Sequence, residues 1–413
     1  MSKKSPQLRF EGFTDDWEER KLSDLFIKGG SGGTPKSTNK AFYDGDIPFL
    51  GISDITKSNG FINNTEKHIS SDGLNSSAAW IVSKGAISLA MYASVGKLAI
   101  LNIDAATSQA FYNMIFDDYD LRDLVYQRLN KANELSEWNK LISTGTQSNL
   151  NADKVKNFQM YLPKNHDEIK LISTFFKQID NTIALHQRKL DLLKEQKKGF
   201  LQKMFPKNGA KVPELRFAGF ADDWEERKLS SGLREYTDRV IVEDDKEYYQ
   251  ISVRNNFGGI TLRGSKMGNK IGRKRQAKIN LTKYPQTLIF TRQTVEQGGI
   301  GWVDKYCDGA IVTENMPTIS LDTSVFSKYF LTNLFQTRIF YKNAILDNIE
   351  GGSAQIAIHE SKFLSSTLLF PNLDEQEKIG QFFKQLDDTI DLHQRKLDLL
   401  KEQKKGFLQK MFV

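Results

Sequence analysis

Residues able to carry catalysis are few and scattered in this sequence. The 413 residues include five histidines and a single cysteine, Cys307, and together these form no recognisable catalytic cluster. One cysteine cannot form an intrachain disulfide or a cysteine-rich zinc site. We therefore predict that the chain has no catalytic residue and no metal site.

Motifs of nucleotide and DNA enzymes are absent or weak. A DNA amino-methyltransferase needs an Asn/Asp-Pro-Pro-aromatic loop around the flipped base, and none of the nine prolines are adjacent. The glycine-rich stretch GGSGGTPKS at 29–37 lacks the G-x-x-x-x-G-K-[ST] spacing of a phosphate loop. Asp244 and Lys246 match a short acidic-x-Lys nuclease pattern, so a single-chain DNA nuclease stays open as the alternative.

Positive charge is concentrated in one segment. Lys and Arg total 58 against 51 Asp and Glu, and this net charge of +7 fits a polyanionic partner without requiring one. The segment RGSKMGNKIGRKRQAK at 263–278 has seven cations and no acid, and its three glycines suit a loop that follows a surface. Such density suits phosphates, and Arg can also read guanine edges. The alternative is a solubilising loop. We favour DNA contact by Arg263, Lys266, Lys270, Arg273, Lys274, Arg275 and Lys278.

Two polar loops supply further candidates in the first half of the chain, where no equally basic segment occurs. The candidates are Lys36, Ser37, Thr38, Asn39, Lys40, Thr146, Gln147, Ser148 and Asn149. From the second half we add Arg292, Gln293, Ser353 and Gln355. Loops rich in Ser, Thr and Asn are also common without function, so these assignments are hypotheses.

The segments that must position these residues, which we call the frame, occur twice in the sequence. Residues 6–23 and 213–230 are identical at 15 of 18 positions, and residues 167–205 and 374–412 at 31 of 39. Both repeats lie 207 residues apart, far beyond the period of a solenoid, so the chain is a domain duplication. The contents between the frames, 24–164 and 231–371, differ. We call these the first and second modules, and we expect a pseudo-twofold molecule that presents two unlike surfaces.

The second repeated segment predicts a long helix in each half, over 167–205 and 374–412. It has no proline, and its apolar residues follow heptad spacing. A helix of 39 residues is about 58 Å long, and one helix alone cannot bury so long a stripe. We expect the two helices to pair antiparallel through Phe176, Ile179, Ile183, Leu190, Leu193, Phe383, Leu386, Ile390, Leu397 and Leu400.

His186 and His393 fall in this seam. They could form a metal or proton site, but we favour polar residues that set the register of the pair. The tract KEQKKGFLQK near each helix end is a solvated face or, less favoured, a contact for DNA or a partner.

Each module is predicted to be mixed α/β. Strand-like runs are IPFLGI, AISLAM and KLAILNI in the first, and YYQISV, TLIFTR and AIVTENMPTISL in the second. Helices are expected over 121–142 and 325–346, each followed by a Gly-[Thr/Ser] loop, a short strand and a proline. The predicted domains are 1–164 and 208–371 for the two globular parts, with the long helices at 165–207 and 372–413. The fold class is α/β (α+β), with two domains joined by an antiparallel two-helix coiled coil.

Several motifs together carry a family resemblance. These are the duplicated P-x-L-R-F-x-G-F…W-E-x-R-K-L at 6–22 and 213–229, GGTPKS…GDIPFLGISDI at 32–55, and the LP…DE and FP…DEQEKI helix entries. Over its full length the sequence resembles the specificity subunit of Type I restriction–modification systems. The second module departs from the opening pattern, because it has YYQISVRNN where the first has IPFLGISDI.

The resemblance implies a non-catalytic subunit whose two target-recognition domains each read one half of a bipartite site in double-stranded DNA. It implies that two methyltransferase subunits dock on the helices, and that restriction/translocase subunits join the complex. S-adenosylmethionine, ATP and Mg would then belong to those partners, with no cofactor on this chain. Since the modules differ while their frames match, we expect two different half-sites. A structural coiled-coil adaptor is a third possibility.

No stretch approaches 18 uncharged apolar residues, and MSKKSPQLRF is followed by no apolar run. We therefore expect no membrane partner and a cytoplasmic location.

Overall fold

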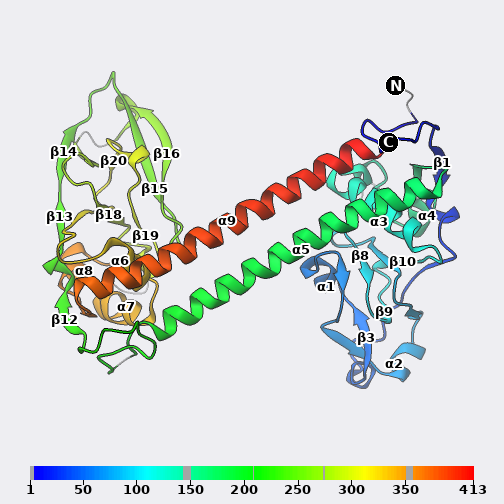
Figure 1. The fold of residues 1–413 in the computed structure, drawn as a ribbon, viewed down its shortest axis with the longest axis horizontal. Coiled ribbons are helices and arrows are strands. Elements are labelled where there is room, and N and C mark those ends of the chain that lie inside the picture. The colour runs from blue at the N-terminus through cyan, green and yellow to red at the C-terminus, as the bar shows by residue number, and fades with distance from the viewer. Residues whose placement is uncertain (1–3, 143–149, 208, 273–274, 350–356) are drawn as a thin grey trace. The chain divides into compact units, whose positions relative to one another are not determined.

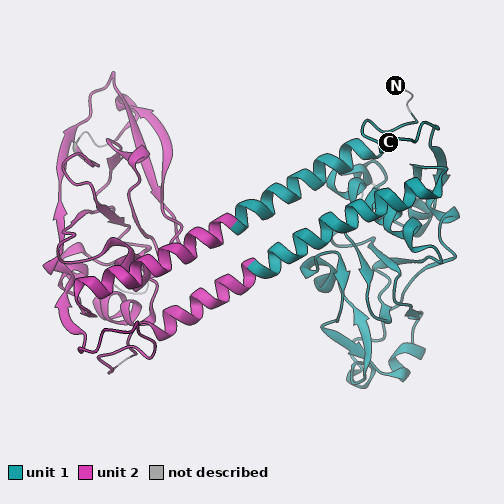
Figure 2. Ribbon diagram, in the orientation of Figure 1, with its two compact units in different colours: residues 1–189, 393–413 teal, residues 190–392 magenta. Residues whose placement is uncertain are grey.

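The computed structural model describes residues 4–142, 150–207, 209–272, 275–349 and 357–413. The chain divides into two compact units, shown in Figure 2. Unit 1 comprises residues 1–189 and 393–413, and unit 2 comprises residues 190–392. Each unit therefore contains one globular part together with a portion of both long helices.

Unit 1 is built on three sheets (Figure 1). The first has five strands in the order β2 (Lys28–Ser31), β10 (Phe111–Ile115), β7 (Ile87–Ala90), β8 (Leu98–Leu101) and β4 (Phe61–Ile62). The second has four, in the order β5 (Lys67–Ile69), β3 (Ile47–Leu50), β9 (Ala105–Thr107) and β6 (Ile81–Val82). The third pairs β1 (Glu18–Lys21) with β11 (Gln159–Leu162). Its helices are α1 (Ile52–Lys57), α2 (Ser71–Asn75), α3 (Tyr119–Glu134) and α4 (Ala152–Lys156).

The central strands of unit 1 are buried on both faces. Along β7 and β8, Leu89 and Ile100 join a core with Leu124 of α3, whereas Ala90 and Leu101 face the second core that contains β3 and β9. A strand covered on both sides reads as a continuous apolar run, and this is why ISLA and LAIL stand out in the sequence.

Unit 2 is layered in a similar way. One sheet has the order β13 (Leu233–Tyr236), β21 (Thr318–Leu321), β18 (Thr287–Phe290) and β19 (Ile300–Trp302). A second has the order β14 (Asp238–Ile241), β17 (Arg275–Lys278), β20 (Ile311–Val312), β15 (Glu247–Val253) and β16 (Ile260–Met267). The pair β12 (Glu225–Lys228) and β22 (Thr367–Phe370) closes the unit. Its short helices are α6 (Lys328–Leu334), α7 (Arg338–Phe340) and α8 (Glu360–Ser365).

Every predicted strand run contains a strand, but three predictions need correction. The run at 310–321 is two strands, β20 and β21. The helix predicted over 325–346 is wrong as a single helix: Thr337 is extended and caps α7, and a π-helical turn follows over Tyr341–Ile345. The helix predicted over 121–142 ends at Glu134, because Ser136 adopts a left-handed conformation with φ of 55°.

The prediction of a loop over 263–278 is also wrong. Residues 263–267 belong to strand β16 and residues 275–278 to strand β17. The strand β16 lies at the edge of its sheet, and residues 262–267 are exposed throughout. It therefore lacks the alternation of apolar and polar residues by which a half-buried strand is recognised.

Two long helices are present, α5 (His166–Lys203) and α9 (Leu373–Met411). In unit 1 the contacts Phe175–Phe407, Asp180–Lys404 and His186–His393 show that α5 and α9 run antiparallel. In unit 2 the contacts Lys197–Asp387 and Phe200–Phe382 show the same direction. All ten predicted seam residues are buried or half-buried. No described helix is long and apolar enough to cross a membrane.

The repeated segment 6–23 fastens to a long helix by a buried ion pair. Both carboxylate oxygens of Glu168 accept from Arg9, at 2.6 and 2.8 Å, and the pair recurs 207 residues later between Arg216 and Glu375 at 2.7 Å. The Trp17 indole N–H donates to Glu168 at 3.3 Å, and Trp17 and Trp224 are both buried, with 1% and 2% of their surface exposed. In each unit, the repeated segment thus attaches the globular part to a long helix.

Candidate nucleic-acid interface

Three loops of unit 1 leave the same end of its five-stranded sheet. Ser31 ends β2, Ala90 ends β7 and Phe111 begins β10, and the register pairs Ser31 with Tyr112 and Ala90 with Phe111. The loops 32–39, 91–97 and 108–110 therefore meet at this end. We call them the unit 1 sheet-end loops.

Hydrogen bonds join these loops to one another. The Gly33 N–H donates to the Thr107 carbonyl at 3.0 Å, and the Met91 N–H donates to the Ala110 carbonyl at 2.7 Å. The Leu150 N–H donates to the Met91 carbonyl at 3.1 Å, which brings Leu150 to the same place. A Cβ on Gly33 would lie 2.6 Å from the Ala78 backbone. The glycines that resembled a phosphate loop are thus explained by close packing.

The candidates at 36–40 lie in these loops and are exposed. Asn39 caps the short helix Lys40–Tyr43, because its side chain accepts from the Ala41 N–H at 3.2 Å. Lys36, Ser37, Thr38 and Lys40 leave their polar ends toward solvent. The candidates Thr146, Gln147, Ser148 and Asn149 lie outside the described residues.

Unit 2 has a matching set of loops. Phe290 ends β18, Ile300 begins β19 and Thr318 begins β21, at one end of the four-stranded sheet. The Arg292 N–H donates to the Asn315 carbonyl, and the Ile358 N–H donates to the Arg292 carbonyl, both at 3.0 Å. Arg292 thus makes the two backbone bonds that Met91 makes in unit 1. We call residues 291–299 and 313–317 the unit 2 sheet-end loops.

The side chain of Arg292 is already engaged. Its guanidinium lies 2.6 Å from the carboxylate of Glu360, which is 9% exposed. Burial, together with the nearby Glu360 carboxylate, raises the pKa of Glu235 above its ordinary value. Gln293 is exposed, and Ser353 and Gln355 lie outside the described residues.

The basic candidates of unit 2 lie on the other sheet. Arg263 and Lys266 project from the edge strand β16 and Lys270 from the turn that follows, and all three are exposed. Lys278 on β17 lies 3.9 Å from Asp238. Arg273 and Lys274 lie outside the described residues, and the side chain of Arg275 is not described.

Two exposed tips, one within the unit 1 sheet-end loops and one beside the unit 2 sheet-end loops, were not singled out by sequence patterns. They are Tyr92–Ser94 in unit 1 and Asn255–Phe257 in unit 2, and both contain consecutive residues with positive φ. The one available signal was the polar, glycine-ended RNNFGG, which is typical of a turn.

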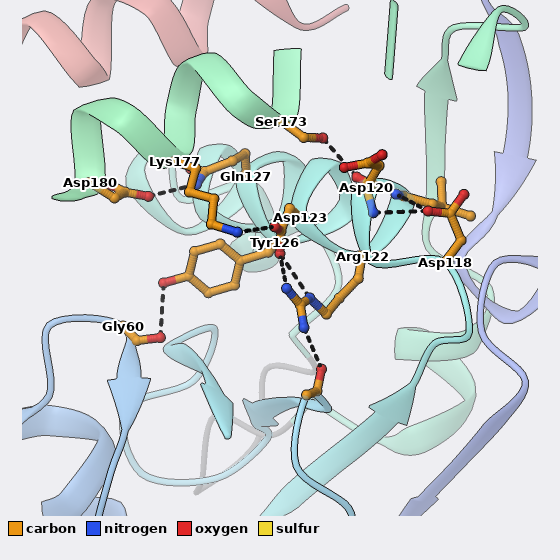
Figure 3. Close-up of polar contacts among 12 residues, drawn as sticks. Gly60, Asp118, Asp120, Arg122, Asp123, Tyr126, Gln127, Ser173, Lys177 and Asp180 are labelled. Carbon is orange, nitrogen blue, oxygen red and sulfur yellow. Dashed lines mark hydrogen bonds and ion pairs between the residues drawn. The ribbon is translucent and has the colours of Figure 1, made fainter. Parts of the chain in front are cut away.

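A polar network joins α3 to α5 within unit 1 (Figure 3). Gln127 donates to Asp180 at 2.7 Å, and Ser173 donates to the Asp120 carbonyl at 2.7 Å. Asp118 caps α3 and lies 2.8 Å from His166. Although burial opposes it, the N–H of Leu121 and the His166 ring hold the pKa of Asp118 below its ordinary value.

This network includes Asp118, Asp120 and His166, the only three-residue group of potential metal ligands in the part of the chain that the structure describes. The cap and hydrogen bonds account for the side chains of Asp118 and His166, and for the backbone of Asp120, as an anchor of the globular part to α5. The nuclease-like Asp244 and Asp245 are exposed on a turn, and Lys246 there pairs with Glu243.

The seam histidines lie side by side. The Nδ1 atoms of His186 and His393 are 3.3 Å apart. Burial, then the His186 ring and the cations of Lys189 and Lys396, hold the pKa of His393 below its ordinary value. Cations in this position disfavour a bound metal ion and agree with a role in register.

Comparisons with known proteins agree on one family. The family model of the Type I restriction modification DNA specificity domain matches residues 14–195 and again residues 222–402. The MjaVIII specificity subunit of Methanocaldococcus jannaschii is 23% identical over 421 residues, which cover 95% of this chain and 91% of that protein.

Two further relatives match about two-fifths of this chain. The MjaIX specificity subunit of Methanocaldococcus jannaschii is 28% identical over 183 residues, 44% of this chain and 41% of that protein. The HindI specificity subunit of Haemophilus influenzae is 29% identical over 174 residues, 40% of this chain and 37% of that protein. The matches thus span under half the length of these two relatives.

Solved structures share the fold. The S subunit of a Type I restriction–modification system from M. genitalium covers 99% of both chains with a TM-score of 0.62 and 13% identity. A chain from a study of complex assembly and conformational transition in the type I system covers 96% of this chain and 97% of its own, with a TM-score of 0.53 and 14% identity.

Proposed function

The chain belongs to the family of Type I restriction–modification DNA specificity subunits, and from this premise we propose that it selects the DNA sequence on which its complex acts. The observation that carries the proposal is the matched pair of sheet-end loops, one in each unit. Met91 and Arg292 make the same backbone bonds on corresponding sheets, yet the surrounding side chains differ. A common scaffold therefore presents two different surfaces, as reading two different half-sites requires.

We propose double-stranded DNA as the ligand of these loops and of the basic edge strand β16. The target-recognition domains are residues 1–164 and 208–371, and the helices at 165–207 and 372–413 form the antiparallel coiled coil that joins them, in a pseudo-twofold internal duplication. The reading residues include the exposed candidates Lys36, Ser37, Thr38, Lys40, Arg263, Lys266, Lys270 and Gln293. Arg292 is paired with Glu360, and Lys278 with Asp238. Each contacts DNA only when this ion pair breaks; while it is intact, the pair supports the fold around the loops.

The helices also offer surfaces for other subunits. In unit 1, Leu185 is 67% exposed and Leu399 59%, and in unit 2 Leu192 is 52% exposed and Leu392 46%. Each lies two positions after a seam residue, on the outer side of its helix. We propose that two methyltransferase subunits dock on these leucines. Restriction/translocase subunits then join the complex.

Catalysis belongs to those partners in this proposal. S-adenosylmethionine, ATP and Mg act on the partner subunits, and this chain carries no cofactor, metal or catalytic residue of its own. We place the chain in the cytoplasm, where its proposed ligand DNA is found.

Methylome sequencing tests the function. A host lacking this system is given the chain together with an Asn-Pro-Pro-aromatic methyltransferase encoded beside it, and the control host receives the methyltransferase alone. We expect a new methylated motif with two unlike halves and an unread spacer, only when the chain is present. Metal-dependent cleavage of DNA by the purified chain alone would instead support a nuclease.

A further inference from the structure

We propose that Tyr92 in unit 1 and Phe257 in unit 2 are specificity-determining residues that stack on DNA bases, one in each half-site. This inference rests on the DNA-reading function proposed above. It adds two side chains that neither charge nor loop composition points to.

Tyr92 stands at a rigid tip between β7 and β8. It is 37% exposed, and the two residues after it, Ala93 and Ser94, have φ angles of 40° and 71°. Left-handed backbone costs an ordinary residue about 1 kcal/mol or more, so two in a row require support from the surroundings.

That support is visible in unit 1. The Lys97 N–H donates to the Ser94 carbonyl at 3.1 Å, which closes the tip. A Cβ on Gly96 would lie 2.4 Å from Trp138, so the base of the tip packs tightly on that buried ring. The tip is held in place although its aromatic side chain remains exposed.

Phe257 stands at the turn between β15 and β16. It is 41% exposed, and Asn256 and Phe257 have φ angles of 55° and 57°. A bulky residue rarely adopts this conformation. The Asn256 and Phe257 N–H groups donate to the carbonyls of Gln297 and Gly298 at 2.7 and 2.9 Å, which ties the turn to the unit 2 sheet-end loops.

Different segments thus place an exposed aromatic ring at corresponding sites. Tyr92 belongs to the hairpin β7–β8, whereas Phe257 comes from another sheet and packs against the loop between β18 and β19. The ring of Phe257 lies over Gly298, where a Cβ would be 3.0 Å from its Cε2 atom. Because two unrelated segments each place an exposed aromatic ring at the sheet-end loops, we infer that the ring has a function.

The surroundings favour DNA over a protein partner. The tip 91–97 carries one cation, Lys97, and the turn 254–259 carries Arg254 and two asparagines, and neither contains an acid. Asn255 donates to Gln297 at 2.7 Å, so amides that can read base edges are already ordered beside the ring. In single-stranded complexes, stacking on a base is worth about 1–3 kcal/mol for one aromatic residue. In a duplex the ring must first open a base step, and the cost of opening depends on the bases of that step, so such a ring can discriminate between sequences.

The test uses the complex of the full chain with its methyltransferase and DNA bearing the motif found by methylome sequencing. Dissociation constants are measured for Tyr92→Ala and Phe257→Ala, and for Tyr92→Phe, which keeps the ring. The matched control is Tyr119→Ala, which removes a ring that is 54% exposed. Tyr119 packs against Gly85, beyond the other end of β7.

We expect each Ala variant to bind about 5- to 150-fold more weakly, since 1–3 kcal/mol corresponds to that range. Tyr92→Phe and the control Tyr119→Ala should bind within about twofold of wild type. In the Tyr92→Ala complex, a base change in one half-site should no longer alter the dissociation constant. In the Phe257→Ala complex, the same should hold for a base change in the other half-site. Replacing bases in turn by 2-aminopurine should locate the quenching partner of each ring.

Wild-type affinity in both Ala variants would overturn the inference while leaving the proposed function intact. Loss of the methyltransferase from the complex, with no change in half-site selectivity, would also overturn it, because the rings would then contact protein. Absence of sequence-selective binding by the wild-type complex would instead contradict the proposed function.

Discussion

At the scale of single residues, the duplicated frame is explained by a buried charge. The carboxylate of Glu168 is 1% exposed and the guanidinium of Arg9 is 14% exposed, and Glu375 and Arg216 repeat this at 0% and 15%. Buried ion pairs need both members, because one member alone is a buried charge without compensation. This requirement accounts for the identity of the two Leu-Arg-Phe motifs and of the Asp-Glu helix starts.

Glu168→Gln should therefore destabilise unit 1 by about 3 kcal/mol, since it leaves the Arg9 charge unpaired. Thermal unfolding and hydrogen exchange of segment 6–23 measure the loss. The control is Glu18→Gln, which breaks a pair with Arg20 in which both side chains are 41% exposed, and which should cost less than about 1 kcal/mol. Equal losses in the two variants would show that burial is not the cause.

The basic edge strand gives a second prediction at this scale. Changing Arg263, Lys266 and Lys270 together to Ala should weaken DNA binding by a similar factor for all sequences. The slope of log affinity against log salt concentration should fall by about 2 to 3, because each phosphate contact contributes about one unit.

A control for that slope removes three exposed lysines that are each paired with an acid. These are Lys57, Lys156 and Lys207, which pair with Glu66, Asp153 and Glu214. The net charge changes equally, so an unchanged slope is expected here. An equal fall in both triple variants would indicate a general charge effect.

At the scale of elements, strands and helices with strong apolar patterns can be predicted from the sequence. Elements whose ends or edges depend on tertiary contacts cannot. The strands β7 and β8 and the helices α5 and α9 have strong apolar patterns, and they were predicted. Residues 262–267 of the edge strand β16 are exposed throughout, so their pattern indicated a loop. The break at Thr337 depends on one side-chain cap, which periodicity does not reveal.

The register of the long helices is set by polar contacts as well as apolar ones. In unit 1, Lys404 lies 2.7 Å from Asp180 with 18% and 14% of the side chains exposed, and in unit 2 Lys197 lies 2.7 Å from Asp387. A double-mutant cycle of Asp180→Asn and Lys404→Gln should give a coupling energy of about 1 kcal/mol.

The matched cycle uses Lys384 and Asp388, a pair within α9 that is 37% and 63% exposed. Its coupling should be about 0.3–0.5 kcal/mol, as is typical of exposed pairs four residues apart. If the Asp180–Lys404 coupling is no larger, these charges do not specify how the helices pair.

At the scale of the whole molecule, the duplication could be read from the sequence, whereas most of the interface could not. Repeats of 15 in 18 and 31 in 39 residues are visible by inspection. Lys36 and Lys40 were found because they lie in a polar loop. Phe257 was missed, because only backbone bonds between distant segments bring it beside the unit 2 sheet-end loops. Tyr92 was missed, because its exposure before two residues of positive φ does not show in the residue pattern.

Exchange of one module tests the central claim most directly. Residues 24–164 are replaced by the corresponding segment of another specificity subunit, and the methylome of the host is sequenced beside that of the unchanged chain. The account predicts that one half of the methylated motif changes while the other half is preserved. A change in both halves, or in neither, would contradict it.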